Sequence, residues 1–201
     1  MVAPYMADEV RNTLVASAPE SLVVVDHAAA DGEARHFENV VTPPSSELSA
    51  ELDSSAEWLG VTVEEILLAA LGRTLGRTRG DGAVVVDVVG GQPGVCRRVS
   101  LLCAAGAPMG PTEMLQGAHN SLTAASGQVD AHSEILLDVT GDSATIASPR
   151  ALGLRVARLA DGLHIEWCYD PGRLDRYSVE EMAEQFPLAL IEITSDAAAP
   201  L

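Results

Sequence analysis

The chain has 201 residues, a size that suits one domain or two small lobes that share a core. Hydrophobic residues make up 47% of it and aromatic residues only 3%, so Leu, Val, Ile and Ala must fill the core. The formal net charge of −17 repels phosphate backbones and anionic lipids, which argues against nucleic-acid binding and membrane docking.

The three cysteines, Cys96, Cys103 and Cys168, are an odd number without zinc-like spacing. They predict a reducing, cytoplasmic location and no metal site. The start of the chain lacks the basic and apolar regions of a signal peptide, and no stretch reaches the ~18 apolar residues of a membrane span.

The first predicted elements lead to a polar cluster. Residues 6–16 fit a short helix, and Leu22–Val25 fits a buried strand that runs directly into Asp26 and His27. Loops that follow a rigid strand often carry functional residues, so Asp26 and His27 are candidate site residues. Residues 42–46, which include two prolines, predict a loop.

Two helices are predicted on either side of residue 60. Glu47–Leu59 looks helical, and Thr62 with Glu65 forms a capping box at the start of a second helix. This helix should end near Gly76–Gly80. Its apolar residues form one stripe, made of Val63, Ile66, Leu67, Ala70, Leu71 and Leu75.

The middle of the chain predicts a central strand and a helix. Ala83–Val89 is nearly all apolar, which indicates a buried strand. Gly90–Pro111 is rich in Gly and Pro and predicts no clear element, whereas Thr112–Leu122 fits a helix. Further strands are predicted at Glu134–Val139 and Leu152–Arg158.

The end of the chain predicts a hairpin and a helix. Asp161-Gly162 is a hairpin signal, and Leu163–Tyr169 alternates as the returning strand. A second capping box, Ser178 with Glu181, opens a last helix that Pro187 should kink. Together the elements predict an open mixed α/β sandwich, with Trp58, Trp167 and Phe186 in its core.

Three stretches, in this order, resemble the C-terminal lobe of condensation and epimerization domains of nonribosomal peptide synthesis. Val61–Leu75 is similar to the opening helix of that lobe. Val84–Gly91 with Cys96–Cys103 is similar to the strand region that carries the epimerization Glu. Asp161–Tyr169, with the helix behind it, is similar to the closing hairpin and helix.

The resemblance implies a chloramphenicol acetyltransferase-like half-domain in the α/β class. It covers roughly residues 36–201, which we interpret as the C-terminal lobe of one domain spanning residues 1–201. Residues 1–35 would be a remnant strand that carries the active-site motif. Domains of this family have two similar lobes with the active site between them.

The family signature, His-His-x-x-x-Asp-Gly, is matched in part by the run from Asp26 to Gly32. The resemblance assigns acid–base catalysis to His27, with Asp26 beside it in the catalytic position of the first His. An imidazole suits this task because its pKa lies near neutrality. Asp31 and Gly32 would be structural, with Arg97 a candidate ion-pair partner for Asp31.

The departures from the family pattern are as informative as the matches. The first His is Asp26, and the epimerization Glu falls at Val89, which cannot exchange a proton. Most of the N-terminal lobe is missing. We therefore expect a homo-oligomer, or a partner protein, to complete the cleft.

A basic cluster, Arg73, Arg77 and Arg79, lies on or after the second predicted helix. It is either a docking patch for an acidic carrier protein and its phosphopantetheine phosphate or a solvated helix end favoured by the helix dipole. Beyond such a phosphopantetheine-linked substrate, we expect no cofactor.

Two functions follow from the sequence. The first is an enzyme acting in trans on a carrier-bound or released intermediate, by His27-assisted acyl transfer, epimerization or cyclization. The second is a catalytically silent module that recruits a carrier protein or a tailoring enzyme to the synthetase. Loss of the first His, at Asp26, and of the Glu, at Val89, favours the silent module. Retention of His27 favours the enzyme.

Overall fold

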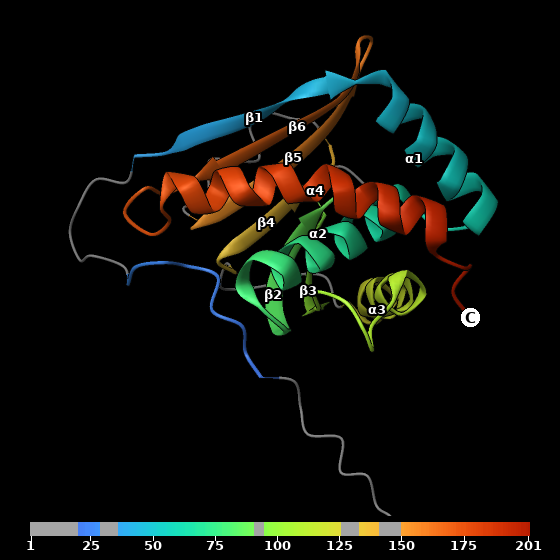
Figure 1. The fold of residues 1–201 in the computed structure, drawn as a ribbon, viewed down its shortest axis with the longest axis horizontal. Helices are drawn as coiled ribbons and strands as arrows, with labels where there is room; N and C mark the ends of the chain where they lie inside the picture. The colour runs from blue at the N-terminus through green and yellow to red at the C-terminus, as the bar shows by residue number, and fades with distance from the viewer. Residues whose placement is uncertain (1–19, 29–35, 91–94, 126–132, 141–149) are drawn as a thin grey trace, which may run out of the picture.

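The computed structural model describes residues 20–28, 36–90, 95–125, 133–140 and 150–201, and the predicted helix at 6–16 lies outside these ranges (Figure 1). Within them, one mixed six-stranded sheet has the strand order β1-β6-β5-β4-β2-β3. The strands are β1 (Glu38–Ser45), β2 (Gly82–Val89), β3 (Cys96–Cys103), β4 (Ile135–Asp138), β5 (Leu152–Leu159) and β6 (Gly162–Tyr169). The α/β class is therefore confirmed.

The described residues form four helices, α1 (Ser46–Leu59), α2 (Val63–Arg79), α3 (Pro111–Ala124) and α4 (Arg176–Asp196). The helices lie on one side of the sheet (Figure 1). The predicted capping box of α2 is present, with Thr62 and Glu65 each bonded to the other's backbone amide. Every residue of α2 from Glu65 to Gly76 is buried, because α3 and α4 flank the helix. The predicted apolar stripe therefore covers only part of the buried surface of α2.

One position of α2, Gly76, requires glycine because the backbone of another segment lies very close to it. A Cβ placed on Gly76 would lie 2.2 Å from the carbonyl carbon of Ala104, in the segment that follows β3. That distance is far below van der Waals contact, so α2 can approach this segment only with glycine at position 76. By contrast, a Cβ on Gly117 of α3 would meet nothing within 4 Å.

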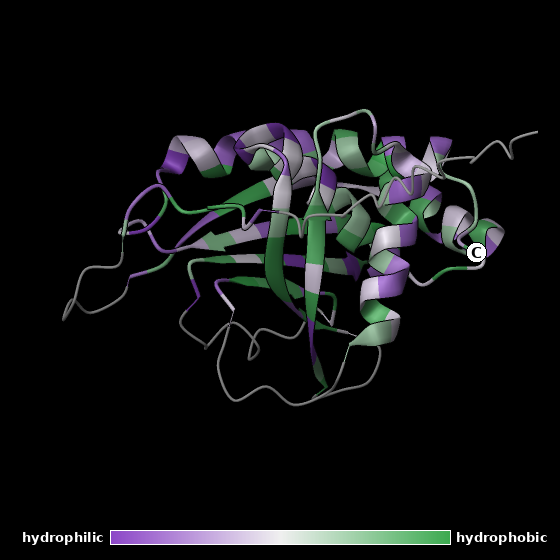
Figure 2. Cartoon of the chain, turned by 90° about the horizontal axis from the view of Figure 1, so that it is seen from below, coloured by the Kyte–Doolittle hydropathy of each residue, from purple (hydrophilic) through white to green (hydrophobic). Residues whose placement is uncertain are grey.

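The two faces of the sheet differ in chemistry. Val84, Val86 and Val88 of β2 belong to the core beneath the helices, and Figure 2 shows how apolar residues concentrate on the strands and the helix sides toward them. Asp87 alternates with these valines and lies on the opposite face, yet it is only 1% exposed. Charged side chains close over it, as expected where a charge is buried.

Asp87 binds two arginines and a loop. Arg98 Nε donates to one carboxylate oxygen at 2.9 Å, and Arg150 donates to the other at 2.8 Å. The Ser133 amide donates to the second oxygen as well, at 3.0 Å. Burial alone raises the pKa of Asp87, but the bonds from Arg98, Ser133 and Arg150 outweigh it and lower the pKa to about 2. Asp87 therefore ties β2 to three other segments.

Several predicted elements are corrected. Leu22–Val25 does not form a buried strand, because it meets the sheet only through a parallel bridge from Ser21 to Ala83, and Val23 is 71% exposed. Residues 42–46 are not a loop. They end edge strand β1 and begin α1, since an edge strand tolerates proline. Trp58 is 74% exposed and not in the core.

The hairpin of β5 and β6 is confirmed, and Gly162, at φ 128°, is the first residue of β6. Trp167 and Phe186 are fully buried and meet edge to face, with ring centroids 5.8 Å apart. The second capping box is wrong. Helix α4 begins at Arg176, so Ser178 lies inside it, and its N-cap residue Asp175 makes no side-chain cap bond.

Candidate functional site

The start of the family-like motif is anchored to two helices at once. Asp26 accepts two bonds from Arg79, at the end of α2, with the shorter at 2.6 Å. Its second oxygen accepts the backbone amide of Asp175, at the start of α4, at 2.8 Å. Burial raises the pKa of Asp26, but the bonds from Arg79, Asp175 and Ser178 prevail and lower it. Asp26 therefore caps α4 from a distant part of the chain and holds the segment before His27 in place.

His27 follows this clamp, and its backbone is held on both sides. Its amide donates to the carbonyl of Arg173 at 3.1 Å, and its own carbonyl accepts Arg173 Nε at 3.1 Å. The imidazole is 52% exposed, and its Nε2 lies 3.1 Å from a carboxylate oxygen of Asp175. A carboxylate can only accept a hydrogen bond, so Nε2 carries the proton in this contact. Nδ1 is then the ring nitrogen left for a substrate.

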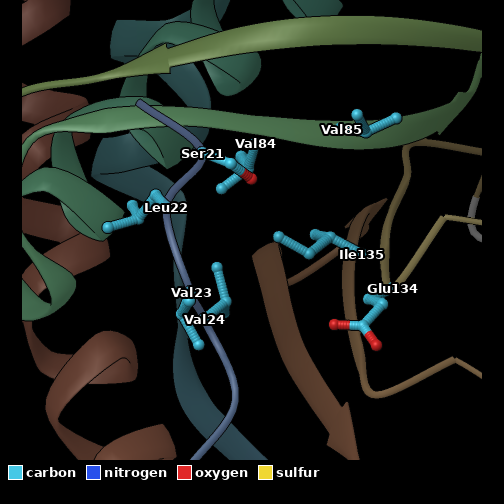
Figure 3. A pocket seen from close by; sticks show the side chains of 8 residues that line it. All are labelled: Ser21, Leu22, Val23, Val24, Val84, Val85, Glu134 and Ile135. Carbon is cyan, nitrogen blue, oxygen red and sulfur yellow. The ribbon is translucent and has the colours of Figure 1, made fainter. Parts of the chain in front are cut away.

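A cavity of about 280 Å³ opens beside this segment (Figure 3). Its lining comes from the extended chain before Asp26, from β2 and from the start of β4, and consists of Ser21, Leu22, Val23, Val24, Val84, Val85, Glu134 and Ile135. The lining is mostly aliphatic. His27 does not line it, but Glu134 does, and Glu134 pairs with Arg173 at 2.6 Å. Arg173 thus connects the cavity rim to the backbone of His27.

The position of the epimerization Glu lies at the other end of the sheet. Val89 is the last residue of β2. Glu134 contacts Arg173, which also contacts His27, and the residue that follows Glu134 pairs with Val86. Val89 therefore lies four residues, about 13 Å along β2, from the level of Glu134. Position 89 thus lies well away from the Glu134–Arg173 pair that contacts the backbone of His27.

A second cavity of about 300 Å³ lies at that far end, between the start of α2 and the loop after β4. Its charged residues are already paired. Glu64 accepts from Arg97 at 3.2 Å, and Arg158 from β5 lies 2.8 Å from Asp53. Arg97, the expected partner of Asp31, thus bonds to Glu64. Asp31 and Gly32 lie outside the described residues.

The basic cluster of α2 is not an open docking patch. Arg73 is 1% exposed and donates to the carbonyls of Ala104 and Met109 at 2.8 and 2.7 Å. Arg77 pairs with Glu192 of α4, and Arg79 holds Asp26. The three guanidinium groups are therefore used inside the fold, which does not support the predicted carrier contact.

The described residues contain no cluster of three His, Cys, Asp or Glu side chains that could hold a metal ion. In the same part of the chain, no helix is both long and apolar enough to cross a bilayer. Burial raises the pKa of the Cys103 thiol to about 12, so it is a poor nucleophile.

Three residues of this region were missed by the sequence reasoning. Glu134, Arg173 and Asp175 surround His27, but they lie more than 100 residues further along the chain. The only local signal was the turn between β6 and α4, where Asp170 accepts the amide of Arg173. Nothing in that turn indicates a partner for His27.

Comparison with known proteins places the fold. No family model matches the chain. It is 26% identical over 230 aligned residues to a component of the phenolphthiocerol/phthiocerol polyketide synthase of Mycobacterium tuberculosis, spanning 86% of this chain but only 15% of that protein. The same values hold for the corresponding protein of Mycobacterium bovis.

Two solved structures show the same architecture. The epimerization domain from the third module of tyrocidine synthetase B superposes with a TM-score of 0.69 at 13% identity, covering 90% of this chain and 52% of that one. The X-domain in complex with OxyB from teicoplanin biosynthesis gives 0.65 at 16% identity, covering 92% and 51%. The resemblance seen in the sequence is thus confirmed for the fold, which matches about half of such a domain.

Proposed function

We propose that this chain, which has the fold of one half of a condensation or epimerization domain, serves a nonribosomal peptide or polyketide pathway and presents His27 as an acid–base residue. The substrate would be a carrier-bound or released acyl intermediate, and a second protein surface would complete the cleft. The fold supports the domain type. The similarity to polyketide synthase components supports the pathway class. The division into a motif-bearing segment, residues 1–35, and a C-terminal lobe, residues 36–201, belongs to the same proposal.

The observation that carries the proposal is the fixed orientation of an exposed imidazole. His27 makes two backbone bonds to Arg173 and a side-chain bond to Asp175, while Asp26 anchors the preceding residue. Holding a half-exposed side chain in one position has an entropic cost. Preorganisation of this kind is what an acid–base residue needs.

The arrangement allows both directions of proton transfer. With Nε2–H bonded to Asp175, Nδ1 can take the proton of an attacking amine or hydroxyl as its nitrogen or oxygen bonds to the thioester carbonyl carbon. The imidazolium, stabilised by Asp175, then returns the proton to the departing thiolate as the carbon–sulfur bond breaks.

The test is turnover of an acyl substrate loaded on its carrier protein, assayed with the partner synthase. His27→Ala is expected to lower kcat by about 10²–10⁴-fold, the usual contribution of general acid–base catalysis. The matched control is His164→Ala, because His164 is also bonded to an aspartate, Asp161, at 2.7 Å but lies on the β5–β6 hairpin. Equal turnover by the His27 and His164 variants would refute a catalytic His27.

A silent recruiting module is the second candidate. Val89 stands where the resemblance expects a catalytic Glu, and neither of the two cavities described above is lined by His27. One structural neighbour is an X-domain in complex with OxyB. Affinity for the carrier or a pathway enzyme that is unchanged in His27→Ala, together with absent turnover in both proteins, would favour this candidate.

The need for a second surface is tested by the state of assembly. Analytical ultracentrifugation of the chain, alone and mixed with the synthase module it serves, should show a dimer or a higher oligomer, or a complex. A chain that stays monomeric in both samples and still turns over substrate would contradict a completed cleft.

A further inference from the structure

The cavity beside β2 arises from a gap in the sheet. β4 pairs with β2 only from Val86 onward, so the first half of β2 has no strand on that side. The extended chain at Ser21 fills the gap only at Ala83, where Leu22 donates to the Ala83 carbonyl at 2.8 Å. The lining includes both Val84 and Val85, which lie on opposite faces of β2, as expected for a gap within a sheet.

The gap has the shape of a narrow apolar slot. Where one strand is missing, the opening is about one inter-strand spacing wide, ~4.8 Å, which suits a single extended hydrocarbon chain. Figure 3 shows Val23 and Val24 on one side of the slot and Ile135 and Glu134 on the other. Val23 and Val85 remain 71% and 48% exposed, so a ligand would cover apolar surface that now faces water.

The cavity volume sets the size of the ligand. At about 280 Å³ it is nearly twice the ~150 Å³ apolar cavity that holds a benzene molecule, which corresponds to roughly ten carbon atoms. Two of its lining side chains are polar. The Glu134 carboxylate is paired with Arg173, and Ser21 offers a hydroxyl. The lining offers a charged ligand no unpaired charged side chain in return for its lost hydration, so a neutral chain is favoured.

The slot and His27 lie along the same chain segment. Val24 lines the slot and precedes His27 by three residues, which span at most about 10 Å. Glu134, on the opposite rim, reaches the His27 carbonyl through Arg173. An acyl group whose carbonyl lies at His27 therefore has a place for its hydrocarbon tail along the same segment.

We propose that this slot binds the unbranched aliphatic tail of an acyl substrate, with the reacting carbonyl held at His27. This inference rests on the proposed function and adds the substrate class to it. The slot selects length because the methylenes of the tail replace water against Val23 and Val85 until the cavity is filled.

The experiment measures binding of neutral N-acetylcysteamine thioesters, from butanoyl to tetradecanoyl, to the full chain by calorimetry. Affinity should rise about fourfold per methylene and stop rising near about ten carbons. Val23→Trp, at an exposed position, should fill the slot and weaken decanoyl binding at least about tenfold. Val41→Trp is the matched control, since Val41 is 61% exposed but lies on edge strand β1.

The outcomes separate the two proposals. Affinity that does not depend on chain length, or equal decanoyl binding by the Val23 and Val41 variants, overturns the acyl slot and leaves the test of His27 turnover as it was. Length-dependent binding that Val23→Trp abolishes supports the slot, even if His27→Ala turns over substrate normally and the proposed function fails.

Discussion

The buried carboxylate of Asp87 offers a sharp test of the packing described above. Asp87→Asn keeps the shape of the side chain but removes the charge that faces Arg98 and Arg150. Lowering the pKa of Asp87 from its ordinary value of 3.8 to about 2 corresponds to about 2 kcal/mol of stabilisation of the folded state. Loss of one member of a buried ion pair costs about 3–5 kcal/mol in other proteins.

We expect a loss near the lower end, about 3 kcal/mol, because Arg98 is 26% exposed and can be hydrated. For a chain of this length, that corresponds to a melting temperature lower by about 6–12 °C. Urea unfolding at neutral pH, followed by circular dichroism, gives the free energy directly. Asp53→Asn is the control, because Asp53 is 53% exposed in its pair with Arg158, and its effect should stay below about 0.5 kcal/mol.

The dependence on pH has a definite sign. The pKa of Asp87 is lower in the folded protein than in the unfolded chain, so its stabilisation is complete above about pH 4 and is lost as the pH falls toward 2. The difference between the wild type and Asp87→Asn should therefore shrink over that range. A difference below about 1 kcal/mol at neutral pH, or one that is the same at low pH, would refute this account.

Three further predictions follow from single contacts. Gly76→Ala should destabilise the protein by about 3 kcal/mol, because the added methyl group clashes with backbone. Gly117→Ala, with open space around it, should stabilise the protein by about 0.5–1 kcal/mol. Equal unfolding midpoints of the two variants would contradict the close approach of α2. Asp26→Asn should destabilise the fold by about 1–2 kcal/mol at neutral pH and by less in acid, since its pKa is lowered on folding. Cys103 should resist iodoacetamide in the folded protein and react after unfolding, because its pKa is raised to about 12; rapid labelling of the native thiol would show that it is not buried.

Local sequence signals determined much of the helical layer and the central strands. The capping box at Thr62 acts within one turn, and the hairpin signal at Gly162 acts between adjacent residues, so both could be read from a few neighbouring letters. The apolar run of β2 indicated a buried strand, which the structure confirms. The cap and the hairpin depend on contacts between residues close in the chain, and the burial of β2 is indicated by its own apolar composition.

Edge strands and caps from distant residues were decided only by the tertiary structure. β1 contains two prolines and β3 follows a Gly-rich stretch, and each becomes a strand because a neighbouring strand pairs with it. The expected cap of α4 was Ser178, but Asp26 takes that role from almost 150 residues away. No local pattern reports such a contact.

The candidate site divides in the same way. The sequence determined that an imidazole, His27, follows an acidic residue in a run similar to a family motif. Only the fold decided that Asp26 is used to anchor α4, that Asp175 and Arg173 hold His27, and that Val89 lies at the far end of the sheet. The reason is physical: a motif fixes which groups are present, but the packing of segments distant in the chain fixes what each group faces.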